Sequence, residues 1–202
     1  MEDEAPRLLF SATLEVLIHQ LLYVGNAYPS QSFTKTIFLG IVGRTNRHVS
    51  VVDYIRDCVD MATPVLLSDG GGKLIVAIGS ERFVLSLRGL NFRPNHDDNN
   101  NSSQLLPALE GQMRDLILST HAMKRRKASN ENDDDDDAFQ IQLKPNSNSC
   151  PELTKGMSEG NWYQSSRLPS ELSDQEEIIR PIHDCFSDLC DFSFYSTVYK
   201  NT

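Results

Sequence analysis

Several features are scarce in this 202-residue sequence, and each scarcity excludes a class of protein. Basic residues are outnumbered: 19 Lys and Arg stand against 28 Asp and Glu, which gives a formal net charge of −9. Affinity for a phosphate backbone comes mainly from Lys and Arg. The balance therefore argues against a stand-alone DNA- or RNA-binding domain, and we expect no direct contact with nucleic acid.

Cysteines are few, and none forms a C-x-x-C pair. The chain has four, Cys58, Cys150, Cys185 and Cys190. Secreted disulfide scaffolds carry denser and more regular cysteines. We expect reduced thiols in the cytosol or nucleus.

Long apolar runs and targeting signals are also missing. No stretch reaches the roughly 18 uninterrupted apolar residues typical of a membrane span. The first residues, Met1–Pro6, are acidic, whereas a secretory signal starts with basic residues and a transit peptide avoids acids. We therefore expect no association with a membrane.

Catalytic motifs are lacking as well. The run Gly70–Lys73 is not a phosphate-binding loop, because Leu74 stands where Ser or Thr is required and a strand follows instead of a helix. His183 and Cys185, with Cys190 nearby, make one loose cluster, whereas structural zinc sites use two close pairs. We find no G-x-S-x-G and no H-E-x-x-H. The sequence therefore favours a binding protein over an enzyme, with no metal and no cofactor.

Helical periodicity, in contrast, is clear in three places. Apolar residues recur every three or four positions over about 8–26, 49–62 and 105–124, and Pro64 is expected to end the second helix. The first helix is apolar on almost every side, which predicts a position in the centre of the core. We expect His19, on that helix, to be a core or boundary histidine.

Strand patterns alternate with these helices. The segments 74–78 and 82–87 predict a β-hairpin around the turn 79–82. We expect further extended segments at 33–42 (irregular), 139–143 and 192–199. A hairpin among helices indicates an antiparallel sheet with the helices on one face, which is an α+β fold.

Two polar stretches interrupt the pattern, near 91–104 and 128–137, and the second ends in five aspartates. Their composition predicts solvated loops. Just before the second stretch, Lys124–Lys127 carries four cations, which suit a helix C-terminus and also resemble a nuclear localisation patch. These two interpretations are compatible.

The tail, from Asn161 onward, allows two interpretations. Its β-forming and aromatic residues could be the last strands of the sheet, which composition alone favours. They could instead close over a foreign strand, because strand addition uses backbone hydrogen bonds for affinity and side-chain pockets for specificity.

Three segments of the first third resemble a known family. Leu14–His19, Leu22–Val24 and Tyr28–Phe33 resemble the opening helix and the Y-P-x-x-x-F turn of HORMA-domain proteins. The resemblance implies one HORMA domain over 1–202, with a core at 8–145 made of three helices on one face of an antiparallel sheet. It also implies that 146–202 is a C-terminal safety belt, a segment that wraps over a partner's peptide.

Other segments resemble one branch of this family, the non-catalytic subunits of DNA polymerase zeta, which act in translesion synthesis. The segments of that resemblance are Asn46–His48, Val52–Ile55, Trp162, Ile179–Ile182, Ser187–Leu189 and Phe192–Tyr195. The branch implies an adaptor in DNA damage tolerance and mutagenesis. The implied location is the nucleus, with the cytoplasm left open.

The same resemblance implies roles for individual residues. Those expected to bind a proline-containing peptide of the polymerase's catalytic subunit are Tyr54, Trp162 and Pro181. Those expected to contact the deoxycytidyl transferase scaffold of the pathway are Ile179, Ser193 and Tyr195. Arg114 matches a position used to pair two HORMA domains, as homo- or heterodimers, and is otherwise an exposed helix arginine.

Three alternatives stay open. A spindle-assembly-checkpoint HORMA protein would capture kinetochore or activator peptides instead. A meiotic chromosome-axis protein usually has a longer chain with its own closure motif, and none follows Tyr199. A small enzyme would need an unrecognised site at His183 and Cys185.

Overall fold

The computed structural model describes residues 4–68, 70–90, 102–126, 139–146, 177–187 and 190–199. Trp162, Cys150 and the aspartate run lie outside these residues. The described elements follow in chain order: α1 (Glu4–Val24), η1 (Ser30–Ser32), β1 (Phe33–Phe38), β2 (Ile41–Asn46), α2 (Val49–Leu66), β3 (Gly72–Ile78), β4 (Glu81–Leu90), α3 (Ser102–His121), β5 (Phe139–Pro145), β6 (Glu177–Phe186) and β7 (Cys190–Tyr199).

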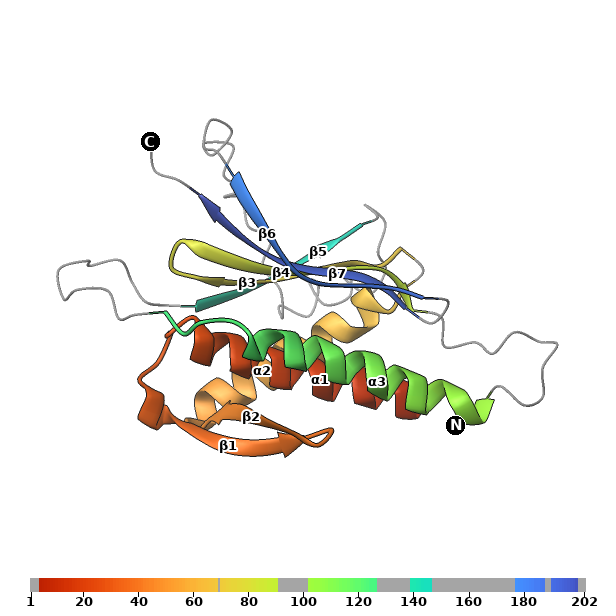
Figure 1. Ribbon diagram of the computed structural model, residues 1–202, viewed down its shortest axis with the longest axis horizontal. Helices are drawn as coiled ribbons and strands as arrows, with labels where there is room; N and C mark the ends of the chain where they lie inside the picture. Colours follow the sequence, from red (N-terminus) through yellow and green to blue (C-terminus); the bar gives the residue numbers. More distant parts are fainter. Residues whose placement is uncertain are drawn as a thin grey trace.

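The main sheet has five antiparallel strands in the order β5-β3-β4-β7-β6. All three helices lie below it in Figure 1, and the small β1–β2 sheet lies on the far side of the helices. The predicted α+β fold, with helices on one face of an antiparallel sheet, is confirmed. The chain therefore forms layers whose core lies between the main sheet and the helices.

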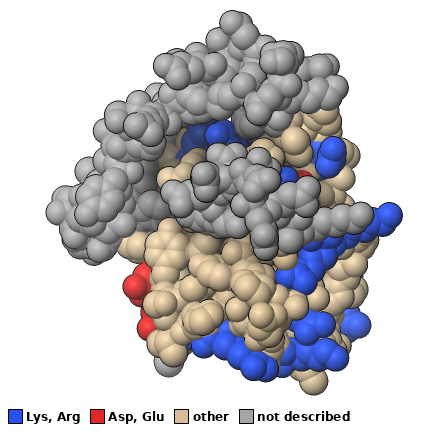
Figure 2. All heavy atoms as spheres, turned by 90° about the vertical axis from the view of Figure 1, so that its left-hand side faces the viewer, with Lys and Arg blue, Asp and Glu red and all other residues tan. Residues whose placement is uncertain are grey.

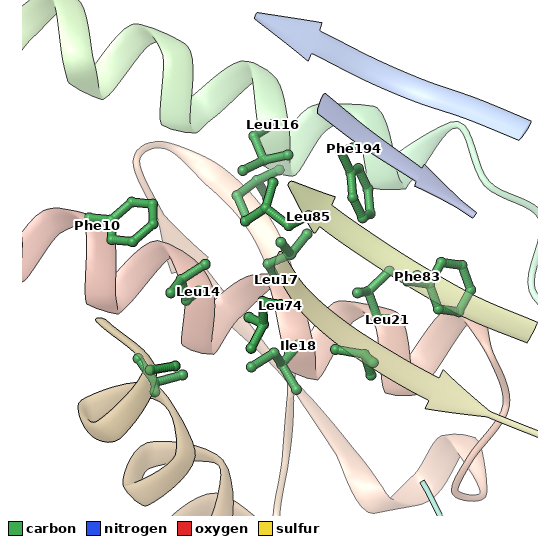
Figure 3. Close-up of a cluster of buried hydrophobic side chains, with 14 of the residues drawn as sticks. Phe10, Leu14, Leu17, Ile18, Leu21, Leu74, Phe83, Leu85, Leu116 and Phe194 are labelled. Atoms are coloured by element: carbon green, nitrogen blue, oxygen red, sulfur yellow. The ribbon is translucent and has the colours of Figure 1, made fainter. Parts of the chain in front are cut away.

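Helix α1 runs through the middle of this core. Side chains from its whole circumference are buried, because it is covered by α2, α3, β2 and the sheet. Figure 3 shows Leu17 and Leu21 of α1 among side chains from β4, α3 and β7, including Leu85, Leu116 and Phe194. The tail strand β7 therefore helps to build the same core as the first helix.

By length and hydropathy α1 is also the one described helix that could cross a membrane. The core helix of a soluble protein passes the same test, and 56% of the apolar window is buried inside the structure. Packing in the core therefore accounts for its composition.

Several helix boundaries differ from the prediction by two to four residues, and α1 begins at Glu4 instead of residue 8. Helix α2 continues past Pro64 to Leu66, because Val65 and Leu66 are 1% and 0% exposed and hold the last turn in the core. Proline removes the hydrogen bond to the carbonyl of Asp60, but that residue is exposed, so water can replace the bond. Helix α3 starts three residues earlier than the expected residue 105, at Ser102.

The irregular segment expected at 33–42 is a regular hairpin. Strands β1 and β2 pair from Phe33↔Asn46 to Phe38↔Ile41 around a two-residue turn. Leu39 and Gly40 have φ of 48° and 74°, the left-handed values that tight hairpins need. Glycine adopts such values readily, whereas leucine gives no turn signal in the sequence.

His19 joins α1 to β2. It is 3% exposed, as expected of a core histidine, and its Nδ1 accepts a hydrogen bond of 3.5 Å from the amide of Asn46. Burial, and secondarily the nearby Arg56, lowers the pKa of His19 to about 4. The neutral imidazole is therefore part of the folded state.

This burial predicts a loss of stability in mild acid. Because the folded pKa lies below the unfolded value, the unfolded chain takes up a proton first as the pH falls from 6.5 to about 4. The shift corresponds to at most about 3 kcal/mol of unfolding free energy. Between pH 7 and pH 4, we expect urea titrations to show a clearly smaller loss of unfolding free energy for His19→Gln than for wild type. An equal loss would contradict the assignment of a buried, neutral His19. The control variant His121→Gln, at an exposed position, should behave like wild type.

Candidate peptide-binding edge of the sheet

Strand β5 forms one edge of the main sheet. It pairs with β3 along its whole length, from Phe139↔Ile78 to Pro145↔Gly72. No strand among the described residues pairs with its other side. An edge of this kind presents backbone N–H and C=O groups that another chain can use.

The hydrogen bonds of neighbouring groups show which residues face outward. The amide of Asn146 donates to the carbonyl of Gly71, so the even-numbered residues here turn toward β3. The amide of Ile141 instead lies on the side of the strand that is close to the hydroxyl of Tyr54 on α2. Because both backbone groups of a residue point to the same side in an antiparallel strand, residues 139, 141, 143 and 145 direct theirs to the free edge.

Pro145 fits this assignment. It is the last residue of β5, and it has no N–H to offer. Within a sheet, proline is tolerated where its missing donor would face away from a partner strand. An outward position at 145 therefore costs the β3–β5 ladder no hydrogen bond.

Aromatic rings gather at the start of this edge. Tyr54 contacts Phe139 edge to face, with ring centroids 5.6 Å apart, and Tyr28 contacts Phe139 from another side at 6.1 Å. Tyr54 is 43% exposed, whereas Phe139 is half-buried. The predicted peptide-binding residue Tyr54 thus lies beside the free edge with part of its ring open to a ligand.

The hydroxyl of Tyr54 is held in its neutral form. Burial chiefly, with the neighbouring thiol of Cys58, raises its pKa to about 12, although the nearby backbone amide of Ile141 acts in the opposite direction. A neutral hydroxyl both donates and accepts. Tyr54 therefore places a neutral hydroxyl close to the thiol of Cys58 and to one outward amide of β5.

The other two residues predicted to bind the peptide are not brought to this edge. Pro181 lies exposed on β6, at the opposite edge of the five-stranded sheet. Its own strand is irregular there, with a register shift between Pro181 and His183. Trp162 lies outside the described residues. Their roles stay predictions.

The three residues predicted to contact the scaffold protein share one face. Phe192 and Phe194 of β7 are buried toward the helices, so Ser193 and Tyr195 face the opposite side. Ile179, 60% exposed, is opposite Thr197 on that same outer face. Their contact with a scaffold protein stays a prediction.

Arg114, predicted to pair two domains, is exposed on α3. Its Nη1 donates to the carbonyl of Leu39 at 3.4 Å and so contacts the β1–β2 turn. The residue is therefore an exposed helix arginine with a contact inside the chain, and its role in pairing stays a prediction.

The cluster at the end of β6 is not a metal site in the described part of the chain, where no group of three or more potential ligands was found. The ring of His183 contacts Phe192, with centroids 5.7 Å apart. The sulfurs of Cys185 and Cys190 are 3.6 Å apart, and Cys190 donates to Oε1 of Gln112. These contacts hold the β6–β7 turn against α3.

Comparison with solved structures gives the fold a class. One chain of a mitotic checkpoint complex superposes with a TM-score of 0.61 at 15% identity, over 96% of this chain and 98% of that one. C. elegans HTP-2 bound to a HIM-3 closure motif superposes with a TM-score of 0.59 at 12% identity, over 98% of this chain and 91% of that one. C. elegans HTP-1 bound to HTP-3 motif-1 superposes with a TM-score of 0.58 at 12% identity, over 99% of this chain and 93% of that one.

These likenesses show that the chain has the HORMA fold, as its opening segments predicted. No protein-family model matches the sequence, and no curated protein matches it either. The fold class is therefore shown by structure, whereas the branch within it stays a proposal.

The proximity of the Tyr54 hydroxyl to the Ile141 amide has a direct test. If the hydroxyl accepts from this amide, Tyr54→Phe, which keeps the ring and removes the acceptor, should speed hydrogen exchange at Ile141 and lower the unfolding free energy by about 1 kcal/mol. NMR-detected exchange would measure both changes. The amide of Gln142, which faces β3, should be unaffected; unchanged exchange at Ile141 would show that Tyr54 does not protect this amide.

Proposed function

We propose that this protein is a non-enzymatic adaptor that captures a peptide of a partner protein as an added strand on the outer edge of β5. The observation that carries the proposal is the free edge itself, with Tyr54 partly exposed beside it. Strand addition supplies affinity through the backbone and specificity through side-chain pockets. In support, HTP-1 and HTP-2, which share the fold, are bound to peptide motifs in their structures.

The number of available backbone groups limits what the edge alone can do. The outward residues offer four carbonyls, at 139, 141, 143 and 145. They also offer three amides, at 139, 141 and 143, because Pro145 has none. Seven hydrogen bonds at roughly 1 kcal/mol each correspond to an affinity between millimolar and micromolar. The entropic cost of association lowers the affinity from backbone hydrogen bonds further, so contacts by side chains must add to it.

The order of the strands provides a way to enclose the peptide. β5 and β6 are consecutive in the chain but lie at opposite edges of the sheet, so residues 147–176 connect one edge with the other. These edges are four strand spacings apart, roughly 19 Å. Thirty residues can extend over roughly 100 Å. The connection is therefore long enough to pass around an added strand, as a safety belt requires.

Enclosure changes the kinetics of binding. A peptide held between β5 and a closed connection leaves only after that connection opens, which slows dissociation more than it speeds association. The β6–β7 hairpin is anchored by ten-residue strands and by the buried Phe192 and Phe194. We propose that this anchored hairpin fixes the far end of the belt.

Within this class we propose the non-catalytic subunit of DNA polymerase zeta. The support is the sequence resemblance at Asn46–His48 and in the closing segment. The peptide would be a proline-containing segment of the catalytic subunit, bound by Tyr54 with Trp162. The deoxycytidyl transferase scaffold would bind the outer face at Ile179, Ser193 and Tyr195, and the protein would act in the nucleus.

The alternative is a checkpoint protein that captures kinetochore or activator peptides. The superposition on one chain of a mitotic checkpoint complex shows the shared fold and does not by itself favour this branch. The fold is common to both, so the peptide that is retained decides between them.

Binding measurements on one labelled peptide from each pathway test the proposal. We expect the polymerase peptide to bind and dissociate slowly, and Tyr54→Ala to weaken it about 30-fold, as for a central aromatic anchor. Fluorescence anisotropy gives the affinity, and stopped-flow chase gives the dissociation rate. Preference for the checkpoint peptide would overturn the branch, and binding of neither would overturn strand capture.

Tyr195→Ala is the matched control. It removes an aromatic ring from the outer face of β7, two strands away from β3 and three from β5. Peptide affinity should therefore stay within about twofold of wild type. Loss of scaffold-protein binding in this variant alone would separate the two proposed surfaces.

A further inference from the structure

A pocket of about 240 Å³ lies where the C-terminal ends of α1 and α3 meet strand β2. Its polar walls come from Gln20, Tyr23, Arg44, His121 and Arg125. We call it the arginine pocket. It is below the size of a typical site for a drug-sized ligand, and it has room for a small anionic group with its water.

Arg44 contributes a charge that is not neutralised. Its guanidinium lies 4.9 Å from the ring centroid of Tyr23 and makes no hydrogen bond or ion pair with the described residues. The residue opposite it on β1 is Lys35, a like charge that increases the local positive potential. Within the described part of the chain, its guanidinium N–H groups therefore have no protein acceptor.

Arg125 approaches the same ring, with its guanidinium 4.8 Å from the centroid. Nε bonds the carbonyl of Tyr23, and Nη2 bonds Asn26 and the carbonyl of Tyr28. These contacts fix the guanidinium against the end of α1 without an acidic partner in the described part of the chain. Nη1 stays available on a side chain whose position is already set.

Gln20 adds a buried polar group to the wall. It is 6% exposed, and its Oε1 has no hydrogen-bond partner among the described residues. A buried amide without a partner is costly in a native structure and calls for an explanation. Because Oε1 is an acceptor, an ordered water in the pocket would supply the missing contact, whereas a phosphate oxygen would not.

The pocket lies in a basic part of the surface. Figure 2 shows the end of the molecule on which α1 and α3 terminate, with Lys and Arg gathered along its right side and lower edge and Asp and Glu mainly at the left margin. The next residue in the chain, Arg126, forms an ion pair of 3.2 Å with Glu81, whereas Arg44 and Arg125 have no acidic partner among the described residues.

We propose that the arginine pocket binds a phosphate monoester. Guanidinium groups match the oxygens of phosphate in pairs, and a phosphate offers three strong acceptors to the donors of Arg44 and Arg125. A carboxylate has two oxygens and a smaller charge, so it would leave donors of both arginines unused. The group comes either from a phosphorylated side chain of a partner protein or from a small phosphorylated molecule.

The proposal does not depend on peptide capture, since it uses none of the residues at the edge of β5. Phosphorus NMR with inorganic phosphate tests the small-molecule source. Anisotropy of a labelled phosphoserine peptide tests the protein source, with the same peptide carrying serine or glutamate as comparison. Binding of the phosphopeptide alone indicates a partner protein, whereas binding of both probes indicates that the phosphate group suffices.

Arg44→Gln removes the charge at an incompletely buried strand position, and we expect it to weaken phosphate binding at least about tenfold. Arg44→Lys keeps the positive charge but loses the paired N–H donors of the guanidinium, so it should bind phosphate with intermediate affinity. Arg47→Gln is the matched control, because Arg47 is exposed and does not line the pocket. Thermal melting verifies that each variant is folded.

Two results would overturn the proposal. One is equal binding of phosphate probes by wild type and Arg44→Gln, including no binding by either. The other is a glutamate peptide that binds as tightly as the phosphoserine peptide, which would show that the pocket does not select phosphate.

Discussion

The free edge of β5 is the constraint on which the rest of this structure depends. Backbone groups at a sheet edge need partners, and a protein that leaves them open risks uncontrolled pairing with other chains. Here the edge is short, ends in Pro145 and has the Tyr54 hydroxyl close to its Ile141 amide. Among the described residues, this leaves a limited set of backbone donors and acceptors that suits one added strand.

The core keeps this edge in place. Helix α1 is buried on every side and carries the sheet on one flank and α2 and α3 on others, so β5 and α2 are fixed relative to each other. This fixed packing is what brings Tyr54 to the edge. The same core includes Phe192 and Phe194, which hold the tail hairpin two strands beyond β3. The edge proposed to capture a peptide and the hairpin at the other edge therefore belong to one packed layer.

Much of this arrangement follows from sequence, because periodicity and β-forming composition report local structure. The three helices, the hairpin around Gly79 and the strands of the tail were all predicted from such patterns. The β1–β2 hairpin was not, since Leu39 is an unusual residue for a left-handed turn. The placement of Tyr54 and Pro181 at opposite edges of the sheet was also not predicted, because strand order within a sheet is set by long-range packing. The arginine pocket is formed by three segments that are distant in the sequence, so no local motif predicts it.

Hydrogen exchange along β5, with and without bound peptide, tests the central claim most directly. In the free protein the outward amides of Phe139 and Leu143 should exchange faster than the amides of Gln140 and Gln142, which face β3. Peptide binding should protect Phe139 and Leu143 while leaving the even-numbered pair nearly unchanged. Protection that appears instead along β6, or nowhere in the sheet, would contradict capture at this edge.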